Sequence, residues 1–447
     1  MLVVFTQEIT NRLQYIFRFL FEEILEVPVK FTDDLHEFNG CTLPKINYSL
    51  LPLDCSLEIH PHPILFQRDI NFQSLESVPY GEEVYFFESS ADSFLPFDPF
   101  AASFYLVSRY EEYLMRELDE HKRYPSHRSV LYRNHLLHKP VVNQWAYTIA
   151  EKIKQAYADF QYRSPSFDFR STIDIDNAWA YKNKSWLRTA GALTKGFLKG
   201  ERKQNEERLQ VIRGEKEDPY ETYDLIRRLY HGRNELLHFF ILLSKTSKYD
   251  RNVSPANEQL QQLVRDLSEN YTLGIHPSYR STRNKKELWR EIKTLESITQ
   301  KKVVSSRQHF LRLELPKTYR RLIKAGIRHD YTLGYADQVG FRAGTSSAFW
   351  FYDLKKDAPT KLRIHPFQFM DVTLKNHLKL SPEEALEIIG KIMGEIRKYG
   401  GTFISLWHNE SLCDQGEWAD WRPVFEQMTE QAIKYKDESA THYLHKS

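Results

Sequence analysis

The pattern of hydrophobic and polar positions changes about a third of the way along the chain. From about residue 167 onward, short apolar runs alternate with longer segments in which apolar residues recur every three or four positions. The candidate strands are FDFRSTIDI, LLHFFILL, TLGIHP, KVVSSRQH, IRHDYTLG, KLRIHPFQF and TFISLWH. Strands that alternate with amphipathic helices are typical of βα units, so the pattern predicts an α/β fold with a parallel sheet or barrel.

The segments between these strands carry signals for helix starts and stops. KKELWREIKTLESIT follows Asn284, a residue type that caps helix N-termini. In SPEEALEIIGKIMGEIRKYGG, Ser381 and Glu384 have the spacing of a capping box, Pro382 falls at the first helical position, and two glycines follow the last turn. ANEQLQQLVRDLSENY and PKTYRRLIKAG complete the set of predicted helices.

The first 165 residues are organised differently. Short strand-like runs, MLVVFT and EVYFFES, mix with proline-containing loops, and a helical face in NQWAYTIAEKIKQAYADF carries Trp145, Ile149, Ile153 and Tyr157. A chain of 447 residues exceeds the usual size of one hydrophobic core. We therefore expect a smaller α+β domain over residues 1–165 and a barrel over residues 166–440.

Residues 181–230 form an insertion between the first two predicted strands. Its first part is basic, and its charged residues are Lys182, Lys184, Arg188, Lys195, Lys199, Arg202, Lys203, Arg208 and Arg213 against Glu201, Glu206 and Glu207. A run of this kind is usually a solvated helix face. The alternative is a lid over the mouth of the barrel that attracts an anionic substrate.

Composition narrows the class of protein. Lysine and arginine total 62 against 60 acidic residues, so net charge gives no argument for a nucleic-acid partner. Cys41, Cys55 and Cys413 lack a disulfide or CxxC pattern, which fits a reducing compartment. Glu8 and Arg12 interrupt the apolar N-terminus before a signal-peptide core forms, and no transmembrane run occurs. We expect a cytoplasmic protein.

Reactive side chains recur at the ends of the predicted strands, where the active sites of (β/α) barrels lie. These residues are Asp174, Asp176, His276, Arg307, His309, Asp337 and His408. Aspartate and histidine can supply the base, the oxyanion donor and the acid that hydrolysis of an amide or ester requires. Because one residue separates them on a strand end, Asp174 and Asp176 point the same way, so one can bind a divalent metal while the other faces the attacking water.

In order along the chain, TIDID, GIHPSY, SRQHF, an aspartate after the next strand and SLWH resemble the five motifs of carbohydrate esterase family 4, the NodB-homology polysaccharide deacetylases. The resemblance spans about residues 167–435. It implies a distorted (β/α) barrel, a divalent metal that is often zinc, and removal of N- or O-acetyl groups from sugars. FDPFAASFYLVSRYEEY also looks like the uncharacterised domain that precedes such barrels in some bacterial proteins.

The resemblance implies a role for each matched residue. Asp174 matches the catalytic base, Asp176 the metal-binding aspartate and His276 the first metal histidine. Arg307 matches the arginine that orients the base, and His408 matches the histidine that protonates the leaving group.

Further roles are less closely tied to the motifs. Asp337 is the nearest match to the acidic residue that supports His408, and Asp371, which also follows a predicted strand, is the alternative. The candidate substrate-binding residues are Tyr279, Arg342 and Trp407. Arg342 lies in GFRAGTSS, whose backbone N–H groups could cradle a carboxylate or phosphate, although a structural turn explains the same sequence.

One position departs from the family pattern. The second metal histidine of the family lies four residues after the first, where this chain has Arg280, and a guanidinium cannot ligate a metal. His309 could turn into the site, water or substrate could fill the gap, or the metal could be absent, as in the cofactor-free amidohydrolases of the wider superfamily.

The expected function is that of a bacterial hydrolase that deacetylates a carbohydrate, with a role in surface-polysaccharide metabolism. A phosphate-linked sugar would suit the basic insertion if that insertion is a lid. Two other functions stay open. The barrel could be catalytically silent and bind a glycan or a protein, or it could hydrolyse a C–N bond of a small molecule without a cofactor.

Overall fold

A nine-stranded sheet forms the centre of the second part of the chain. In the computed structural model, which describes residues 1–75, 78–81, 83–115 and 117–444, its strands follow the order β11-β12-β10-β9-β8-β7-β6-β14-β13. Neighbours are parallel except β11, which is antiparallel to β12. The bounds are β6 Phe167–Ile175, β7 Leu237–Ile241, β8 Thr272–Ile275, β9 Ser305–Ser306, β10 His329–Asp330, β11 Phe349–Asp353, β12 Ala358–Ile364, β13 Phe369–Met370 and β14 Gly401–His408.

The predicted α/β fold with a mostly parallel sheet is confirmed, and each predicted strand contains a strand of this sheet. KLRIHPFQF is divided between β12 and β13, which residues 365–368 connect without a helix. Arg363 of this segment pairs with His329 of β10, whereas Phe369 pairs with Ser405 of β14. One bent segment thus pairs with strands near both ends of the strand order. Among the described residues the paired strands form an open series from β11 to β13, so a closed barrel is not shown.

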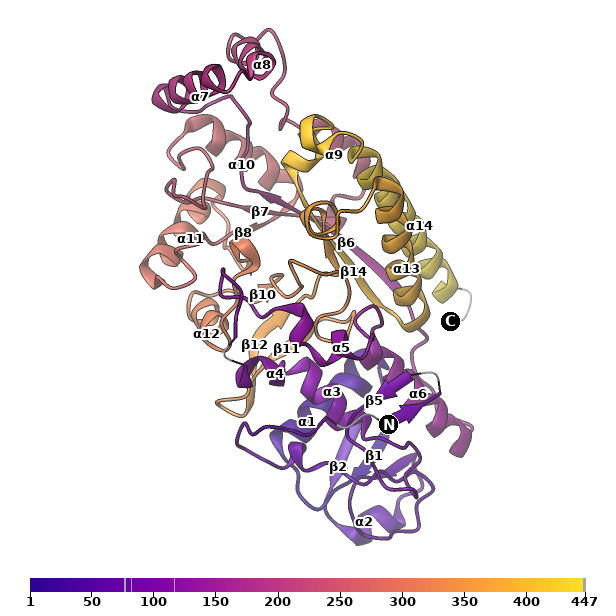
Figure 1. Cartoon of the computed structure of the whole chain (residues 1–447). Helices are drawn as coiled ribbons and strands as arrows, with labels where there is room; N and C mark the ends of the chain where they lie inside the picture. The colour runs from indigo at the N-terminus through magenta and orange to yellow at the C-terminus, as the bar shows by residue number, and fades with distance from the viewer. Residues whose placement is uncertain (76–77, 82, 116, 445–447) are drawn as a thin grey trace.

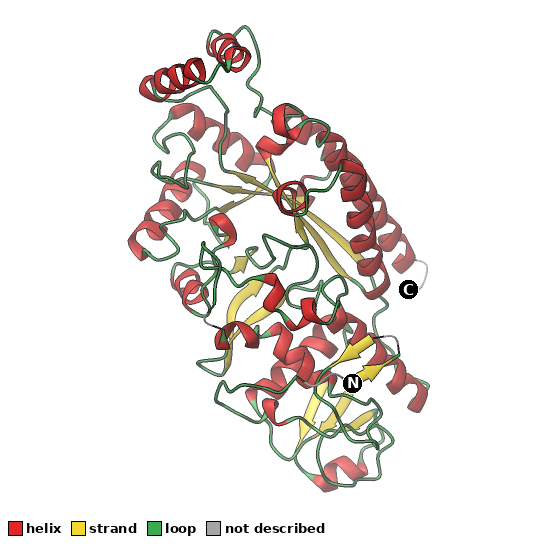
Figure 2. Ribbon diagram, viewed as in Figure 1, coloured by secondary structure: helices red, strands yellow, loops and turns green. Residues whose placement is uncertain are grey.

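Helices pack along the outside of this sheet (Figure 2). Their bounds are α9 Tyr223–Leu229, α10 Glu258–Asn270, α11 Lys285–Thr299, α12 Lys317–Lys324, α13 Pro382–Tyr399 and α14 Arg422–Leu444. The capping box predicted for α13 is present, because Ser381 Oγ accepts from the Glu384 N–H and the Glu384 carboxylate accepts from the Ser381 N–H. The Asn284 side chain likewise caps α11. These helix starts were readable from the sequence because capping is local.

The insertion after β6 contains α7 (Trp186–Leu198) and α8 (Arg202–Ile212), followed by α9. Figure 1 shows α7 and α8 side by side, protruding beyond the sheet and its covering helices. Asn205 Nδ2 of α8 donates to the carbonyl oxygen of Leu193 in α7 at 2.9 Å. Of the helices that the structure describes, none is long and apolar enough to cross a membrane.

The N-terminal region has its own small parallel sheet, of order β2-β1-β3, and a β4-β5 hairpin. The bounds are β1 Leu2–Phe5, α1 Asn11–Arg18, β2 Val29–Thr32, α2 Leu35–Gly40, β3 Lys45–Asn47, β4 Val78–Tyr80, β5 Glu83–Tyr85, α3 Pro99–Val107, α4 Tyr110–Leu114, α5 Val130–Arg133 and α6 Val141–Ala156. Arg12 Nε lies 2.7 Å from Asp357 Oδ1, and the Tyr15 hydroxyl donates to the Trp350 carbonyl oxygen at 2.6 Å. One continuous apolar core extends from this region into the large sheet.

Candidate active site

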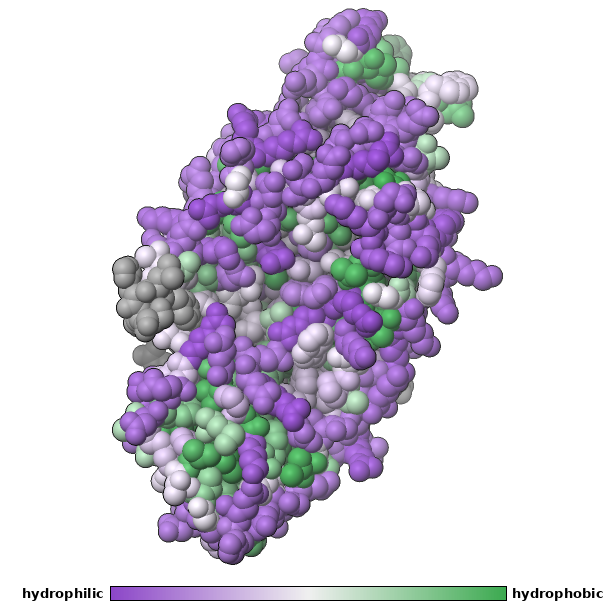
Figure 3. Space-filling view, turned by 180° about the vertical axis from the view of Figure 1, so that it is seen from behind, coloured by the Kyte–Doolittle hydropathy of each residue, from purple (hydrophilic) through white to green (hydrophobic). Residues whose placement is uncertain are grey.

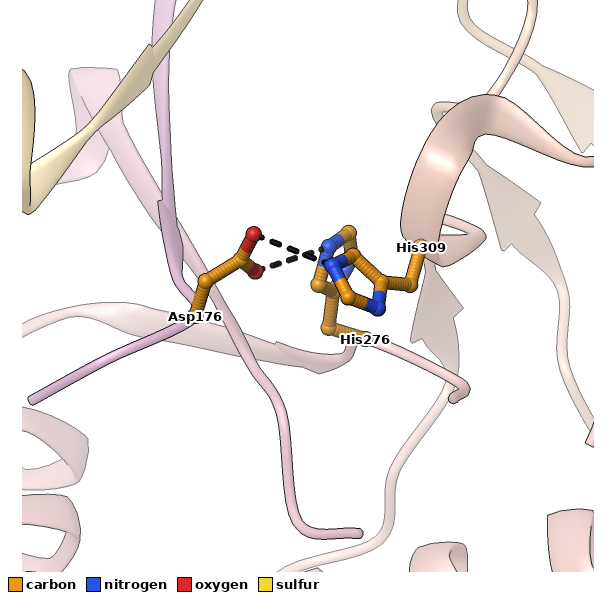
Figure 4. Close-up of side chains that lie close together, drawn as sticks. All are labelled: Asp176, His276 and His309. Atoms are coloured by element: carbon orange, nitrogen blue, oxygen red, sulfur yellow. Dashed lines mark hydrogen bonds and ion pairs between the residues drawn. The ribbon is translucent and has the colours of Figure 1, made fainter. Parts of the chain in front are cut away.

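Three of the predicted residues form a compact group of potential metal ligands. The ligand atoms of Asp176, His276 and His309 all lie within 4.8 Å of one another. Asp176 Oδ1 is 3.2 Å from His276 Nε2, and Asp176 Oδ2 is 3.1 Å from His309 Nε2. Figure 4 shows the carboxylate facing both imidazole rings. Asp176 and His276 directly follow β6 and β8, and His309 lies three residues beyond the end of β9. The parallel topology therefore brings the three residues together.

Both histidines are held by a second hydrogen bond on the opposite ring nitrogen. His276 Nδ1 lies 2.6 Å from the Arg307 carbonyl oxygen, and His309 Nδ1 lies 2.9 Å from Asp250 Oδ1. A partner on Nδ1 fixes the ring orientation and leaves Nε2 directed at the carboxylate, the usual arrangement around metal-ligating histidines. Asp250 also accepts from the Tyr279 N–H at 2.9 Å, which anchors the loop after β8.

Asp174, the predicted base, is buried beside this group. Arg307 Nη1 donates to Asp174 Oδ1 at 2.9 Å, and Arg307 Nε donates to the Tyr331 carbonyl oxygen at 3.0 Å. The guanidinium of Arg307 lies 4.6 Å from the ring centroid of Phe240, so it is held from several sides. Asp174 Oδ2 is 3.6 Å from His276 Nε2. The arginine therefore orients one carboxylate oxygen, while the other faces the ligand group.

His408, at the end of β14, approaches the group from the other side. Its Nδ1 lies 2.8 Å from Asp371 Oδ1, its backbone N–H donates to Asp371 Oδ2 at 2.8 Å, and its Nε2 is 3.8 Å from Asp176 Oδ2. The Ser411 hydroxyl also donates to Asp371. Asp371 is thus fixed by several donors and directs the His408 ring toward the centre of the site.

The charges around the site determine which groups hold protons. Burial raises the pKa of Asp176, but His309 and His276 oppose it and hold that pKa well below its ordinary range. Burial lowers the pKa of His309, whereas Asp176 raises it, with the result at about 9. Burial also lowers the pKa of His408, yet the charge and hydrogen bond of Asp371 raise it well above its usual value. The surroundings of His408 therefore favour its imidazolium form, which can donate a proton.

The structure answers the question raised by Arg280. Its side chain is exposed, whereas His309 is buried with Nε2 turned toward Asp176. A divalent ion fits the chemistry of Asp176, His276 and His309, since two imidazole nitrogens and one carboxylate are a common zinc ligand set. Asp176 Oδ1 is buried, and its contact among the described residues is the ion pair with His276 Nε2 at 3.2 Å, so both of its neighbours in the ligand group face it directly.

Asp337 requires a correction. Its carboxylate accepts from the Ser126 hydroxyl at 2.7 Å, in contact with the N-terminal region, and the residue that supports His408 is Asp371. The sequence left both open because each follows a strand. Their different environments are set by the bend after β12, which no local pattern indicates.

Two predicted substrate-binding residues are buried in the structure. Trp407 is completely buried and packs against Phe369 and Phe425. As the neighbour of His408 on β14, it points to the opposite face of the strand. Arg342 is buried in an ion pair with Glu112, whose carboxylate it contacts at 2.8 Å. These side chains stabilise the fold and are closed to a ligand.

Tyr279, the third candidate, lies in a partly exposed aromatic cluster beside the three potential metal ligands. Its ring stacks on Tyr249 with centroids 4.1 Å apart, and the guanidinium of Arg312 lies 3.8 Å from its centroid. Phe310, the residue after His309, closes the cluster at 5.4 Å from Tyr279. Tyr249 and Arg312 therefore cover the two faces of the Tyr279 ring, and only its edge is open to a ligand.

Asp250 was missed by the sequence analysis. It lies in the loop after β7, in the run KTSKYDRN, and its acidic side chain follows a strand as the other site residues do. That position was the available signal. Its separation of nine residues from the strand end concealed it.

A cavity of about 1070 Å³ borders the site at Asn177, the residue after Asp176. Its lining includes Tyr220, Arg188 of α7 and Arg251. Lys184 Nζ lies 3.3 Å from Asn177 Oδ1, and burial lowers the pKa of this lysine to about 8. Residues of the basic insertion thus line a space that reaches Asn177, the neighbour of Asp176.

Comparisons with known proteins give the following matches. Residues 2–158 match the model of a family of unknown function, DUF7033. A search of the curated proteins gave no match. Among solved structures, the chain is similar to a Mycobacterium smegmatis protein assigned as a polysaccharide deacetylase, at 12% identity and a TM-score of 0.38, over 60% of this chain and 85% of that chain. It is also similar to the Puue allantoinase, at 10% identity and a TM-score of 0.38, over 60% of this chain and 84% of that chain.

Proposed function

We propose that this chain is a metal-dependent hydrolase that removes acetyl groups from a carbohydrate, on a distorted (β/α) barrel over residues 166–440. One observation carries the proposal. The Asp176, His276 and His309 group lies between an arginine-bound aspartate and an aspartate-bound histidine. A protein that only binds a glycan has no need of an oriented carboxylate and a protonated imidazole on either side of a ligand set.

The proposed roles follow from the contacts. Asp174 accepts the proton of the attacking water, and Arg307 keeps its carboxylate in a fixed orientation. His408 donates from Nε2 to the departing amine or alcohol, and Asp371 holds the ring and favours its protonated form. Asp176, His276 and His309 would hold the metal, which, when bound, supplies a Lewis acid at the centre of the site.

The order of proton transfers is set by these positions. Asp174 begins ionised and ends protonated, while His408 begins protonated and ends neutral. Net hydrolysis of an N-acetyl group consumes one water and yields acetic acid and an amine, which become acetate and an ammonium group when a proton passes between the products through solvent. Returning the proton from Asp174 to His408 through solvent restores the starting state of the two residues.

The test is release of acetate from acetylated glycans and chitooligosaccharides by the full chain, before and after chelation. We expect activity that chelators abolish and zinc restores. Asp174→Asn should lower kcat by about a hundredfold or more, because base catalysis contributes factors of that order. Asp168→Asn is the matched control, since Asp168 lies on the same strand at its other end and pairs with Lys436. Equal activity of Asp174→Asn and the unsubstituted chain would refute the proposal.

We further propose that the substrate carries a phosphate group, which the cavity next to Asn177 would receive. Support comes from the lining of this cavity, in which Lys184, Arg188, Lys203, Arg208, Lys216 and Arg251 outnumber Glu206, Glu207 and Glu417. We expect kcat/KM to be higher for phosphate-linked than for free acetylated sugars, and Arg188→Gln to reduce that difference. Equal values for both substrates in the unsubstituted chain would remove the electrostatic argument.

A further inference from the structure

The solvent-facing side of α7 is apolar. Trp186, Phe197 and Leu198 are 75%, 73% and 79% exposed. Leu187 is also exposed, and so are the small residues between them on the same face. A surface helix normally turns its apolar stripe toward the core, whereas the apolar stripe of α7 faces solvent.

The other side of α7 explains the inversion. Arg188, Thr189 and Ala192 line the cavity beside the candidate active site, and Gly196 is buried against Asn205 of α8. A Cβ at Gly196 would lie 2.4 Å from Asn205 Oδ1, so the close approach of the two helices fixes which face points outward. The exposed apolar face is therefore set by packing and is not a frayed end.

The exposed apolar residues are concentrated on α7 and α8. Among the described residues, most of the large hydrophobic side chains that are more than 70% exposed lie on α7, and Leu209 and Ile212 of α8 add to the same protruding pair. Figure 3 shows hydrophobic atoms at the tip of the molecule where α7 and α8 protrude. Contiguous apolar surface on a protrusion is typical of an interaction site.

Charge identifies what covers this face. Lys184 and Arg188 face the cavity, whereas Lys195 of α7, Lys199 just after it, and Arg202 and Lys203 of α8 are exposed. Glu201 is the one acidic residue among positions 181–203. A helix with tryptophan, phenylalanine and leucine on one side, flanked by lysine and arginine, matches the chemistry of an interface of anionic lipids.

We propose that α7, supported by α8, is a docking surface for an anionic lipid membrane. With 13 residues, α7 is shorter than the roughly 20 needed to cross a bilayer, so it lies in the interface with its apolar face inserted. Docking would hold the cavity and the candidate active site close to the membrane surface. A second copy of the chain is a poorer occupant, because a two-fold contact through α7 would oppose the same lysines on both subunits.

The test uses the full chain in flotation with vesicles of phosphatidylcholine alone and of phosphatidylcholine with one third phosphatidylglycerol. We expect binding to the anionic vesicles and weakening with salt. The double variant Phe197→Ser, Leu198→Ser should lose binding by about tenfold or more, because inserted apolar area drives this mode. Lys195→Glu with Lys199→Glu should lose at least about fivefold for each lysine, since each cation near such a surface contributes that order of affinity.

Matched controls separate docking from unfolding. Phe72→Ser removes an exposed phenylalanine of the N-terminal region, 85% exposed, and Lys355→Glu reverses an exposed lysine in the turn between β11 and β12. Both should bind vesicles like the unsubstituted chain. Failure of the unsubstituted chain to float, or equal flotation of all variants, would overturn the proposal. So would a loss of dimers in the α7 variants without any vesicle binding, which would identify a second copy as the occupant. None of these readouts depends on hydrolysis.

Discussion

At the scale of single residues, each reactive side chain of the candidate site has a partner that fixes its direction. Arg307 holds Asp174, Asp250 holds His309, and Asp371 holds His408. Such partners matter because a ligand or proton donor acts only in the correct orientation and protonation state.

His309 is expected to be a metal ligand in place of the residue at position 280. His309→Ala should abolish stoichiometric zinc, and Asp250→Asn should weaken zinc binding about 10- to 100-fold, because it removes the hydrogen-bond partner of a ligand. Arg280→Ala is the control and should keep full zinc content. Elemental analysis after dialysis against a competing chelator measures all three. Zinc lost on replacing Arg280, and kept on replacing His309, would reverse the assignment.

Asp371 and Asp337 should differ sharply in their effect on activity. Asp371→Asn removes the charge that keeps His408 protonated, so kcat should fall by about a hundredfold or more and the alkaline limb of the pH profile should move to lower pH. Asp337→Asn leaves His408 untouched and should keep kcat within a small factor. A pH–rate profile of both variants decides the matter, and equal losses would contradict the geometry.

Glu291 makes folding stability depend on pH. This buried residue of α11 accepts from the Ser278 N–H, its Oε1 has no hydrogen-bond partner among the described residues, and burial raises its pKa to about 7. The folded chain therefore binds this proton more tightly than the unfolded chain, whose carboxyl titrates near pH 4. Its contribution is favourable at low pH and is lost as the pH rises from about 4 to about 7.

Glu291→Gln should remove that loss. The variant should gain stability relative to the unsubstituted chain at pH 8, on the order of 2–3 kcal/mol, and gain little at pH 5. Thermal melts at the two pH values provide the measurement. Glu269→Gln, at the exposed end of α10, is the control and should give a difference that does not depend on burial. An identical shift for both variants would show that the burial of Glu291 has no role.

At the scale of elements, strand alternation places neighbouring residues in opposite environments. On β14, His408 faces the site while Trp407 packs in the core against Phe369 and Phe425. The bend between β12 and β13 is equally decisive, because it delivers Asp371 to His408. Both features explain why a residue near a motif can still be purely structural.

Trp407→Ala should act as a core substitution. Removal of a fully buried tryptophan should lower the free energy of unfolding by about 3–5 kcal/mol. Trp407→Phe should recover part of this loss and keep zinc content near normal, because no ligand is touched. Denaturation and zinc analysis of the two variants are the measurements. Zinc lost in a well-folded Trp407→Phe would show that this residue contributes to the site.

At the scale of the whole molecule, buried charges join the N-terminal region to the large sheet. Glu112 of α4 accepts from Arg109 Nε at 2.9 Å and from Arg342 Nη2 at 2.8 Å. Arg342 Nη1 also donates to the Gly334 carbonyl oxygen at 2.8 Å. We propose that residues 1–165 and 166–440 are nonetheless two domains, since each has a sheet of its own.

This interface should depend on Arg342. Arg342→Met leaves Glu112 with one partner in a buried setting, so it should lower the free energy of unfolding by about 3–5 kcal/mol. Arg328→Met, on an exposed arginine, should change it little. Limited proteolysis combined with thermal melts would show whether the two regions separate. If Arg342→Met is as stable as the control, the ion pair does not hold them together.

The sequence by itself determined the alternation of strands and helices, the caps of α11 and α13, and the motif residues Asp174, Asp176, His276, Arg307 and His408. These are readable because side-chain period and capping are local, and because parallel strands bring their ends to one edge. Only the tertiary structure showed that His309 fills the place that Arg280 cannot, that Asp371 supports His408, and that Arg342 and Trp407 are buried. The tertiary structure also showed that the apolar face of α7 points to solvent. Such outcomes depend on contacts between different elements of the fold, which burial and close packing decide and local pattern does not record.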